Sequence, residues 1–296
     1  METLLLTGAT GFLGYNFLQQ DLSNYNIVAV TNQRKFSFPN NIKTTAVYLA
    51  NAESINKALH NIKPDAVVHL AAISNANFCE ENIGLSQQVN VTATIQLATW
   101  CSNYNVPFIF TSTDLVFDGA KGNYNETDAV NPLGIYGKQK VEAEKSVLEI
   151  YPSACVLRMP VMFGYGGNHA QSFMQPFLQK LQKGESLQLF TDEYRSVVGG
   201  FSAAKGISLA LQHNWKGLHH LGGKEKLSRY DFGLLLCEVF SIDKTLIIPT
   251  LQKEVKMAAP RPADVTLNSE KAYGLGYDPL LVLDELKLIS KAHFIL

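Results

Sequence analysis

The chain has 296 residues, of which 46% are hydrophobic and 17% are charged. This length and composition are typical of one large or two medium globular domains, and they exclude a disordered chain. The 25 basic and 26 acidic residues leave a formal net charge of −1. Such a balance lacks the basic excess that binds nucleic acid or an anionic membrane, so we expect neither as a partner.

The cysteines and the N-terminus indicate the cellular compartment. Cys79, Cys101, Cys155 and Cys237 are widely spaced, without the close pairs that make a zinc site. So few cysteines are typical of a reducing compartment. The N-terminus lacks the basic segment and long apolar run of a signal peptide, and no apolar run approaches the ~20 residues of a membrane helix. We therefore expect a cytoplasmic protein without a metal site.

Strand-like and helix-like segments alternate over the first 160 residues. The expected strands are Thr3–Thr7, Ile27–Thr31, Thr44–Leu49, Ala66–Leu70, Pro107–Thr111 and Ala154–Met159. The expected helices are Phe12–Asp21, Ser54–Asn61, Ser86–Tyr104 and Gly134–Ile150. Most of these strands are continuous apolar runs, which are typical of parallel strands covered on both faces. The alternation predicts a doubly wound parallel sheet of the Rossmann-like α/β class.

The second half of the chain is less regular. Helices are expected at Ser172–Lys183, Ser202–Gln212, Ser228–Phe240 and Pro279–Ala292, and a short strand at Leu187–Phe190. We expect residues 1–160 to form a dinucleotide-binding domain, which residues 197–215 rejoin as a helix on the main sheet. Residues 161–296 are expected to form a smaller C-terminal α/β lobe that binds substrate.

A glycine triplet follows the first strand. Gly8, Gly11 and Gly14 lie three residues apart at the start of a helix. The first permits a tight turn, the second lets backbone N–H groups approach a pyrophosphate, and the third allows close packing of helix on strand. A glycine turn without a ligand is the alternative. We predict that the pyrophosphate of a dinucleotide is bound here, by Gly8, Thr10, Gly11, Phe12 and Leu13.

The residues after the second strand bear on the choice of cofactor. NAD-binding proteins place an acid there for the ribose 2′-hydroxyl, but the segment Val30–Lys35 has none. Arg34 and Lys35 could instead pair with the 2′-phosphate of NADP, or they could be solvated loop cations. We predict that NADPH is preferred over NADH, with Asn32, Arg34 and Lys35 at the adenosine ribose.

The ends of two later strands face the same site. Small residues at the end of the fourth strand leave room for the cofactor, and the fifth strand ends beside it. The residues predicted to contact the cofactor are Leu70, Ala71, Ala72 and Thr111. His69 precedes them in an apolar strand and has no evident partner. We interpret it as a core histidine and not as a catalytic base.

A Tyr-x-x-x-Lys pair, Tyr136 and Lys140, opens the helix after the fifth strand. Residues four apart share one helix face. Reduction of a ketone needs a proton for the developing alkoxide, and Tyr136 is the candidate donor, with its pKa lowered by the charge of Lys140. Thr113, aided by Ser112, would hold the carbonyl oxygen. The alternative is an exposed tyrosine beside surface lysines.

These residues together resemble a known family. The segment Thr7–Gly14 resembles the T-G-x-x-G-x-x-G loop of the extended short-chain dehydrogenase/reductases. Thr113, Tyr136 and Lys140 match the Ser/Thr, Tyr and Lys triad of that family. The resemblance implies a nicotinamide-dependent oxidoreductase that binds its cofactor through Tyr136 and Lys140 as well as the glycine loop.

Two further segments indicate a branch of this family. Ser112–Gly119 reads STDLVFDG and is similar to the STDYVFDG run of dTDP-4-dehydrorhamnose reductases, and Arg261–Leu267 matches their R-P-x-x-x-x-L segment. This resemblance implies reduction of a 4-keto nucleotide sugar by NADPH. The residues expected to bind the substrate are Ser74, Ser112, Thr113, Asp114, Arg195 and Arg261.

The chain departs from this branch where the substrate would lie. The branch's D-Q-x-G-x-P-T segment is here Asp192–Val198, with Arg195 in place of the glycine. The sugar is therefore left open, and two other functions remain. One is a sugar-nucleotide epimerase or dehydratase, although Leu115 after Asp114 leaves the acid pair of dehydratases incomplete. The other is a non-catalytic NADP-binding subunit, like the regulatory subunit of methionine adenosyltransferase.

Family members commonly pair two long helices across a two-fold axis. The corresponding segments here are Ser86–Tyr104 and Gly134–Ile150. We therefore expect a homodimer, which is also the commonest oligomer.

Overall fold

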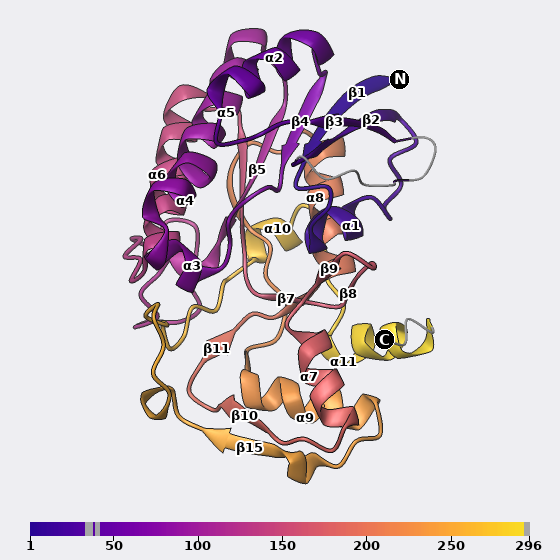
Figure 1. The fold of residues 1–296 in the computed structure, drawn as a ribbon, viewed down its shortest axis with the longest axis vertical. Coiled ribbons are helices and arrows are strands. Elements are labelled where there is room, and N and C mark those ends of the chain that lie inside the picture. Colours follow the sequence, from indigo (N-terminus) through magenta and orange to yellow (C-terminus); the bar gives the residue numbers. More distant parts are fainter. Residues whose placement is uncertain (33–37, 39–41, 293–296) are drawn as a thin grey trace.

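The computed structural model describes residues 1–32, 38 and 42–292. Its larger part is built on a seven-stranded sheet, seen in the upper part of Figure 1. From edge to edge the strands are β13 (Gly217–His220), β6 (Cys155–Met159), β5 (Phe108–Thr113), β4 (Ala66–His69), β1 (Glu2–Thr7), β2 (Tyr25–Thr31) and β3 (Lys43–Ala46). All neighbouring pairs are parallel. The predicted parallel sheet is confirmed, and its strand order reverses between β1 and β4, as in doubly wound folds.

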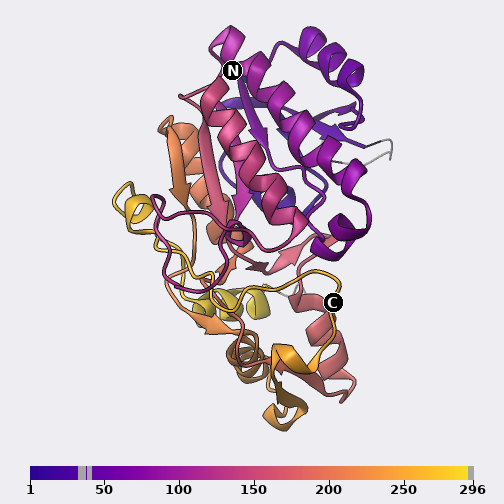
Figure 2. The ribbon, with the colours of Figure 1, turned by 90° about the vertical axis from the view of Figure 1, so that its left-hand side faces the viewer.

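Helices cover both faces of this sheet. On one face lie α2 (Ala52–Ile62), α5 (Ala93–Tyr104) and α6 (Ile135–Ile150), and Figure 2 shows the long helices side by side over the strands. On the other lie α1 (Phe12–Phe17), α8 (Gly200–Gln212) and the region of α10 (Glu270–Tyr273). Side chains alternate between these layers: Leu4 and Leu6 pack into one core and Leu5 into the other. This explains why most of the expected strands read as continuous apolar runs.

The chain returns to the sheet after residue 196. Helix α8 packs against α1, β5 and β6, and β13 then adds an edge strand beside β6. The strand was not expected from the sequence, because its four residues, Gly217 to His220, include two histidines and show no apolar run.

A smaller lobe lies below the sheet in Figure 1. It contains α7 (Met174–Gln182), β10 (Leu187–Phe190), α9 (Arg229–Val239), β15 (Ile247–Thr250) and α11 (Val282–Lys291). Strands β10 and β15 pair in parallel. The lobe has its own core, centred on Phe163, Phe232 and Leu236. Short two-residue strand pairs complete it: β7 (Met162–Phe163) with β12 (Val198–Gly199), β8 (Tyr165–Gly166) with β9 (Ala170–Gln171), and β11 (Tyr194–Arg195) with β14 (Leu227–Ser228).

Several helices differ from their expected extents, and the reason is visible in two of them. Helix α1 ends at Phe17, short of the expected Asp21, because the N–H groups of Gln19 and Gln20 bond to carbonyls only three residues earlier. The helix expected from Ser86 starts earlier, as α4 (Ile83–Gln87), and reaches α5 through a wider π-type turn at Gln88–Thr92. It is preceded by the short α3 (Ala76–Glu81). Among the helices of the described residues, none combines the length and apolarity needed to cross a membrane.

Candidate active site

A pocket of about 1030 Å³ opens where the carboxyl ends of the central strands meet the smaller lobe. Ligands of doubly wound sheets bind at this edge, near the reversal of strand order. All predicted site residues within the described part of the chain line it: Gly8, Thr10, Gly11, Phe12, Leu13, Asn32, Leu70, Ala71, Ala72, Ser74, Thr111, Ser112, Thr113, Asp114, Tyr136, Lys140, Arg195 and Arg261. The remaining two, Arg34 and Lys35, lie outside the described residues.

The glycine loop is shaped by close backbone contacts. Gly8 has a φ of +73°, and a Cβ atom there would lie 2.7 Å from the backbone of Leu70 and Ala71. A Cβ on Gly14 would collide with the carbonyl oxygen of Gly8. The loop closes on itself through a bond of 2.9 Å from the N–H of Gly11 to that oxygen. Glycine is therefore required for the loop to pass so close to the end of β4.

Tyr136 and Lys140 lie one turn apart on α6, and both side chains are buried. The Lys140 ammonium donates a 3.0 Å hydrogen bond to the carbonyl of Thr111 and lies 4.6 Å from the Phe110 ring centroid. It is 5.9 Å from the ring of Tyr136. Burial lowers the pKa of Lys140 to about 8, although the nearby Glu144 carboxylate opposes this shift.

The pKa of Tyr136 moves upward in this environment. Burial raises it above the ordinary value, and the neighbouring Cys79 and Asp114 add to the increase. This net direction is opposite to the lowering that the sequence argument expected from Lys140. A tyrosine with a raised pKa is a neutral phenol at neutral pH, which is the state that can donate a proton.

The end of β5 presents three polar side chains. Thr113 Oγ1 donates to Asp114 Oδ1 at 3.1 Å and accepts from the N–H of Leu115 at 3.2 Å. The hydroxyl of Ser112 is buried and has no hydrogen-bond partner among the described residues. Burial raises the pKa of Asp114 to about 6, even though Arg195 opposes the shift.

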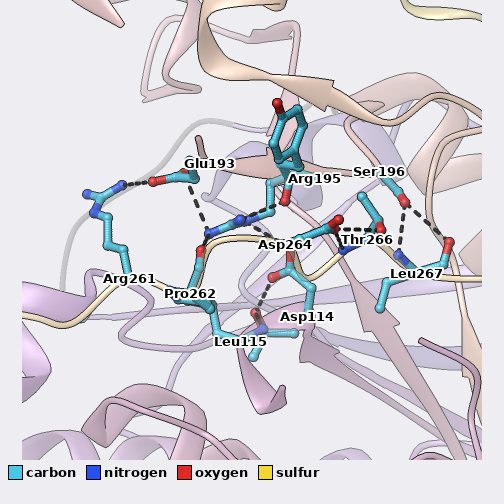
Figure 3. A network of polar contacts seen from close by, with 12 residues as sticks. Asp114, Leu115, Glu193, Arg195, Ser196, Arg261, Pro262, Asp264, Thr266 and Leu267 are labelled. Atoms are coloured by element: carbon cyan, nitrogen blue, oxygen red, sulfur yellow. Dashed lines mark hydrogen bonds and ion pairs between the residues drawn. The ribbon is translucent and has the colours of Figure 1, made fainter. Parts of the chain in front are cut away.

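Asp114 belongs to a charged wall, which we define as Asp114, Glu193, Arg195, Arg229 and Arg261. Figure 3 shows four of these residues around the segment that starts at Arg261. Arg195 lies between the acids, with Nε 3.6 Å from Asp114 Oδ2 and Nη2 3.6 Å from Glu193 Oε1. Its remaining N–H groups donate to the carbonyls of Tyr194, Pro262 and Ala263. Arg195 thus joins the end of β5 to the smaller lobe.

Glu193 is the centre of this wall. It is 1% exposed, and it also lies 3.3 Å from Arg229 Nε and 3.5 Å from Arg261 Nη1. Burial would raise its pKa, but the three arginines outweigh burial and lower it. Neither Glu193 nor Arg229 was predicted from the sequence to be a site residue. The only signal for Glu193 was its place in a segment that departs from the resemblance, and no spacing connects it with Arg229.

His69 lies beneath the pocket and is fully buried. Its Nδ1 is 2.6 Å from Thr7 Oγ1 and its Nε2 is 2.9 Å from Thr94 Oγ1, so both ring nitrogens have partners. Burial lowers its pKa to about 3. The ring is therefore a neutral part of the core, as the sequence indicated. Within the described residues, no group of three or more His, Cys, Asp or Glu side chains is arranged to hold a metal ion.

The sequence matches a known protein family over most of its length. Residues 1–280 match the family described as RmlD substrate binding domain. The chain belongs to this family.

Its relatives include a protein named as a probable reductase and a protein named as a subunit of an adenosyltransferase. The chain is 29% identical over 282 residues to "Methionine adenosyltransferase 2 subunit beta" of Rattus norvegicus, covering 92% of this chain and 82% of that protein. It is 30% identical over 250 residues to a "Probable low-salt glycan biosynthesis reductase" of Haloferax volcanii, covering 83% of each.

Solved structures of RmlD-type proteins share the fold. A dTDP-4-dehydrorhamnose reductase from Clostridium acetobutylicum superposes with a TM-score of 0.85 at 24% identity, over 99% of this chain and 100% of that chain. The enzyme of the same name from Bacillus anthracis, in complex with NADP, superposes with a TM-score of 0.86 at 19% identity, over 98% and 99%. The complete fold of this chain, including the smaller lobe, is therefore shared with these two structures.

Proposed function

We propose that this protein reduces the keto group of a 4-keto nucleotide sugar with NADPH. The observation that carries the proposal is the pocket itself. It brings the glycine loop, the Tyr136 and Lys140 side chains and the charged wall to one cavity. In this proposal residues 1–160, with the return of 197–215, bind the dinucleotide, and residues 161–296 bind the substrate.

The cofactor proposal rests on shape and on residue type. The close approach of Gly8 to Leu70 and Ala71 leaves a cradle without side chains for a pyrophosphate. Asn32 lines the pocket where NAD-binding proteins place an acid. The related Bacillus anthracis reductase was crystallised with NADP. NADPH, when bound, supplies the hydride.

Proton delivery is proposed for Tyr136. Its raised pKa keeps the phenol protonated, and Lys140, with a pKa of about 8, is largely charged at neutral pH. That ammonium would stabilise the phenolate left after proton transfer. The Thr113 hydroxyl donates to Asp114, so the unpartnered hydroxyl of Ser112 is the freer donor toward the carbonyl oxygen.

The substrate's anionic part is proposed to meet Arg261. Its side chain is 39% exposed, whereas that of Arg195 is 5% exposed. A guanidinium suits a diphosphate because it can form two parallel hydrogen bonds. Arg195 already donates to backbone carbonyls of the protein, so we propose that it acts on the substrate through Asp114 and Glu193.

The direct test is NADPH consumption with a panel of 4-keto nucleotide sugars. Oxidation of NADPH with formation of the alcohol supports a reductase. An epimerase or dehydratase would convert sugar nucleotides without net oxidation, and that result would replace our proposal.

A non-catalytic subunit is the second candidate, because the relatives named methionine adenosyltransferase 2 subunit beta match 92% of this chain. It predicts NADP binding without conversion of any keto sugar. It also predicts a stable complex with a methionine adenosyltransferase, which gel filtration of the mixed proteins would detect.

A further inference from the structure

Several buried polar atoms around the pocket have no hydrogen-bond partner. In the described part of the chain six side-chain atoms are in this state, and four belong to residues that line the pocket. These four are Ser112 Oγ, Asp114 Oδ2, Glu193 Oε2 and Arg229 Nη1. Leaving a buried polar atom unpaired is unfavourable, so such atoms need an explanation. Their concentration at one pocket points to a ligand that completes their hydrogen bonds.

Three of these atoms lie in the charged wall, which begins beside the reaction centre. Asp114 follows Thr113 directly and accepts its hydrogen bond. The Arg195 guanidinium bridges Asp114 and Glu193, with 3.6 Å to each carboxylate. Only the width of one guanidinium therefore separates the acids. A sugar whose keto group reaches Tyr136 would lie along this part of the wall, and its diphosphate would lie toward the more exposed Arg261.

The chemistry of these atoms disfavours a phosphate as their main partner. Asp114 Oδ2 and Glu193 Oε2 are carboxylate oxygens, which accept hydrogen bonds. Each lies at ion-pair distance from a guanidinium, 3.6 Å from Arg195 Nε and 3.5 Å from Arg261 Nη1, without a hydrogen bond to it. A diphosphate at neutral pH has no proton to donate and would be repelled by both acids. A sugar hydroxyl donates to a carboxylate in a charge-assisted hydrogen bond, and its oxygen can accept from a guanidinium.

Arg229 is held in a fixed orientation for such a contact. Its Nε lies 3.3 Å from Glu193 Oε1, and its guanidinium carbon lies 4.2 Å from the centroid of the Phe173 ring. The ion pair and the ring contact leave Nη1 without a partner. An arginine restrained in this way loses little further freedom when it binds.

We propose that Asp114, Glu193 and Arg229 form a subsite for hydroxyl groups of the sugar ring, in which Glu193 determines the preference for a hydroxylated sugar. This inference rests on the proposed function. Glu193 stands where the resembling reductases have a glutamine, and Arg195 replaces their glycine. These two differing residues, Glu193 and Arg195, form an ion pair with each other. A carboxylate binds a hydroxyl more strongly than a neutral amide does, so the exchange sharpens selection at this position.

The test compares a sugar nucleotide with its free nucleotide. Binding of dTDP-glucose, UDP-glucose, dTDP and UDP is measured by calorimetry in the presence of saturating NADPH. Glu193→Gln is expected to weaken the binding of dTDP-glucose and UDP-glucose about tenfold or more, since a charge-assisted hydrogen bond is lost. The variant should bind dTDP and UDP with unchanged or higher affinity, because a negative charge has been removed from the surroundings of their diphosphates.

Arg229→Met is the second variant. It removes the Nη1 donor while keeping a side chain that packs on Phe173, and it should weaken the glucose conjugates more than the free nucleotides. Glu238→Gln is the matched control, because Glu238 is an exposed acid of the same lobe, paired with Lys244 at the surface. NADPH affinity and thermal unfolding of each variant report whether the fold is intact.

The outcomes separate this inference from the proposed function. If a variant bound the glucose conjugates and the free nucleotides with equally reduced affinity, the hydroxyl subsite would be overturned. Unchanged affinity of both variants for the conjugates would overturn it too. In either case the reductase proposal would stand. A wild-type protein that binds no sugar nucleotide would overturn both.

Discussion

The Glu80 carboxylate accepts a hydrogen bond of 2.7 Å from the backbone N–H of Ile135, the first residue of α6. The preceding residue, Gly134, has no side chain to cap this helix. A Cβ at Gly134 would lie only 3.0 Å from Glu80 Oε1. A residue of α3 thus caps the helix that carries Tyr136 and Lys140. The position of Tyr136, in the first turn, depends on this contact between two segments of the chain.

Removing the cap should affect both stability and turnover. We expect Glu80→Ala to lower the free energy of unfolding by about 1 kcal/mol, the usual cost of losing a helix cap. It should also lower kcat more than it raises the KM for NADPH, because the first turn of α6 carries Tyr136. Denaturant unfolding and steady-state kinetics measure the two effects. Glu80→Gln keeps an acceptor oxygen and should restore much of both; equal losses in the two variants would contradict capping.

Replacing the proposed proton donor should separate binding from chemistry. Tyr136→Phe removes one oxygen atom and keeps the buried ring. We expect NADPH affinity to be unchanged and turnover to fall by about 10²- to 10⁴-fold, the usual contribution of a positioned general acid. Fluorescence titration and NADPH oxidation measure the two quantities. A loss of turnover below about tenfold, or about 1.4 kcal/mol in the barrier, would remove Tyr136 from this role.

Asp114 should make stability depend on pH. Burial raises its pKa from 3.8 to about 6, so the folded protein holds this proton more tightly than the unfolded chain. The stability that this proton contributes is complete below pH 4 and is lost as the pH rises through 6. Asp114→Asn cannot ionise. Its unfolding free energy relative to wild type should therefore increase between pH 4 and 7, by on the order of 3 kcal/mol.

Denaturant unfolding of both proteins across this pH range is the measurement for Asp114. The difference between the two proteins is the relevant quantity, because groups that do not interact with Asp114 titrate equally in both. A difference that stays constant from pH 4 to 7 would show that Asp114 has the same pKa in the folded and unfolded states.

The cofactor preference can be tested at positions that the sequence alone indicates. Arg34 and Lys35 lie outside the described residues, so this prediction rests on residue type. We expect NADPH to bind at least about tenfold more tightly than NADH, and Arg34→Ala to remove most of the difference. Lys35→Ala should matter less, because an ammonium cannot form the bidentate contact. Titrations at several salt concentrations should show the preference weakening as salt rises. Equal affinities at low salt would refute the assignment.

The predicted homodimer can be tested by measuring the mass of the protein in solution. The long helices α5 and α6 pack against each other on one face of the sheet, and Tyr104 at the end of α5 is 65% exposed. We expect light scattering at micromolar concentration to give twice the chain mass of 32.7 kDa. A monomer mass would contradict a dimer formed through these helices.

The sequence by itself determined the parts of this protein that depend on local geometry. The glycine triplet lies within one strand-to-helix turn, where backbone spacing alone shows which residues approach a ligand. Tyr136 and Lys140 lie on one helix, and four residues of separation place them on the same face. The continuous apolar strands also indicated a sheet covered on both sides. Each of these patterns is complete within a short stretch of chain.

The tertiary structure decided which distant residues meet. Glu193 and Arg229 are 36 positions apart and Glu80 and Ile135 are 55 apart, and no periodicity connects either pair. Glu193 meets Arg229 because β11 and β14 pair in antiparallel fashion, with Tyr194 opposite Ser228. Glu80 meets Ile135 because α3 lies beside α6. The direction of the Tyr136 pKa shift was likewise decided by burial, since desolvation depends on everything packed around the phenol. Spacing along the chain carries no information about that surrounding volume.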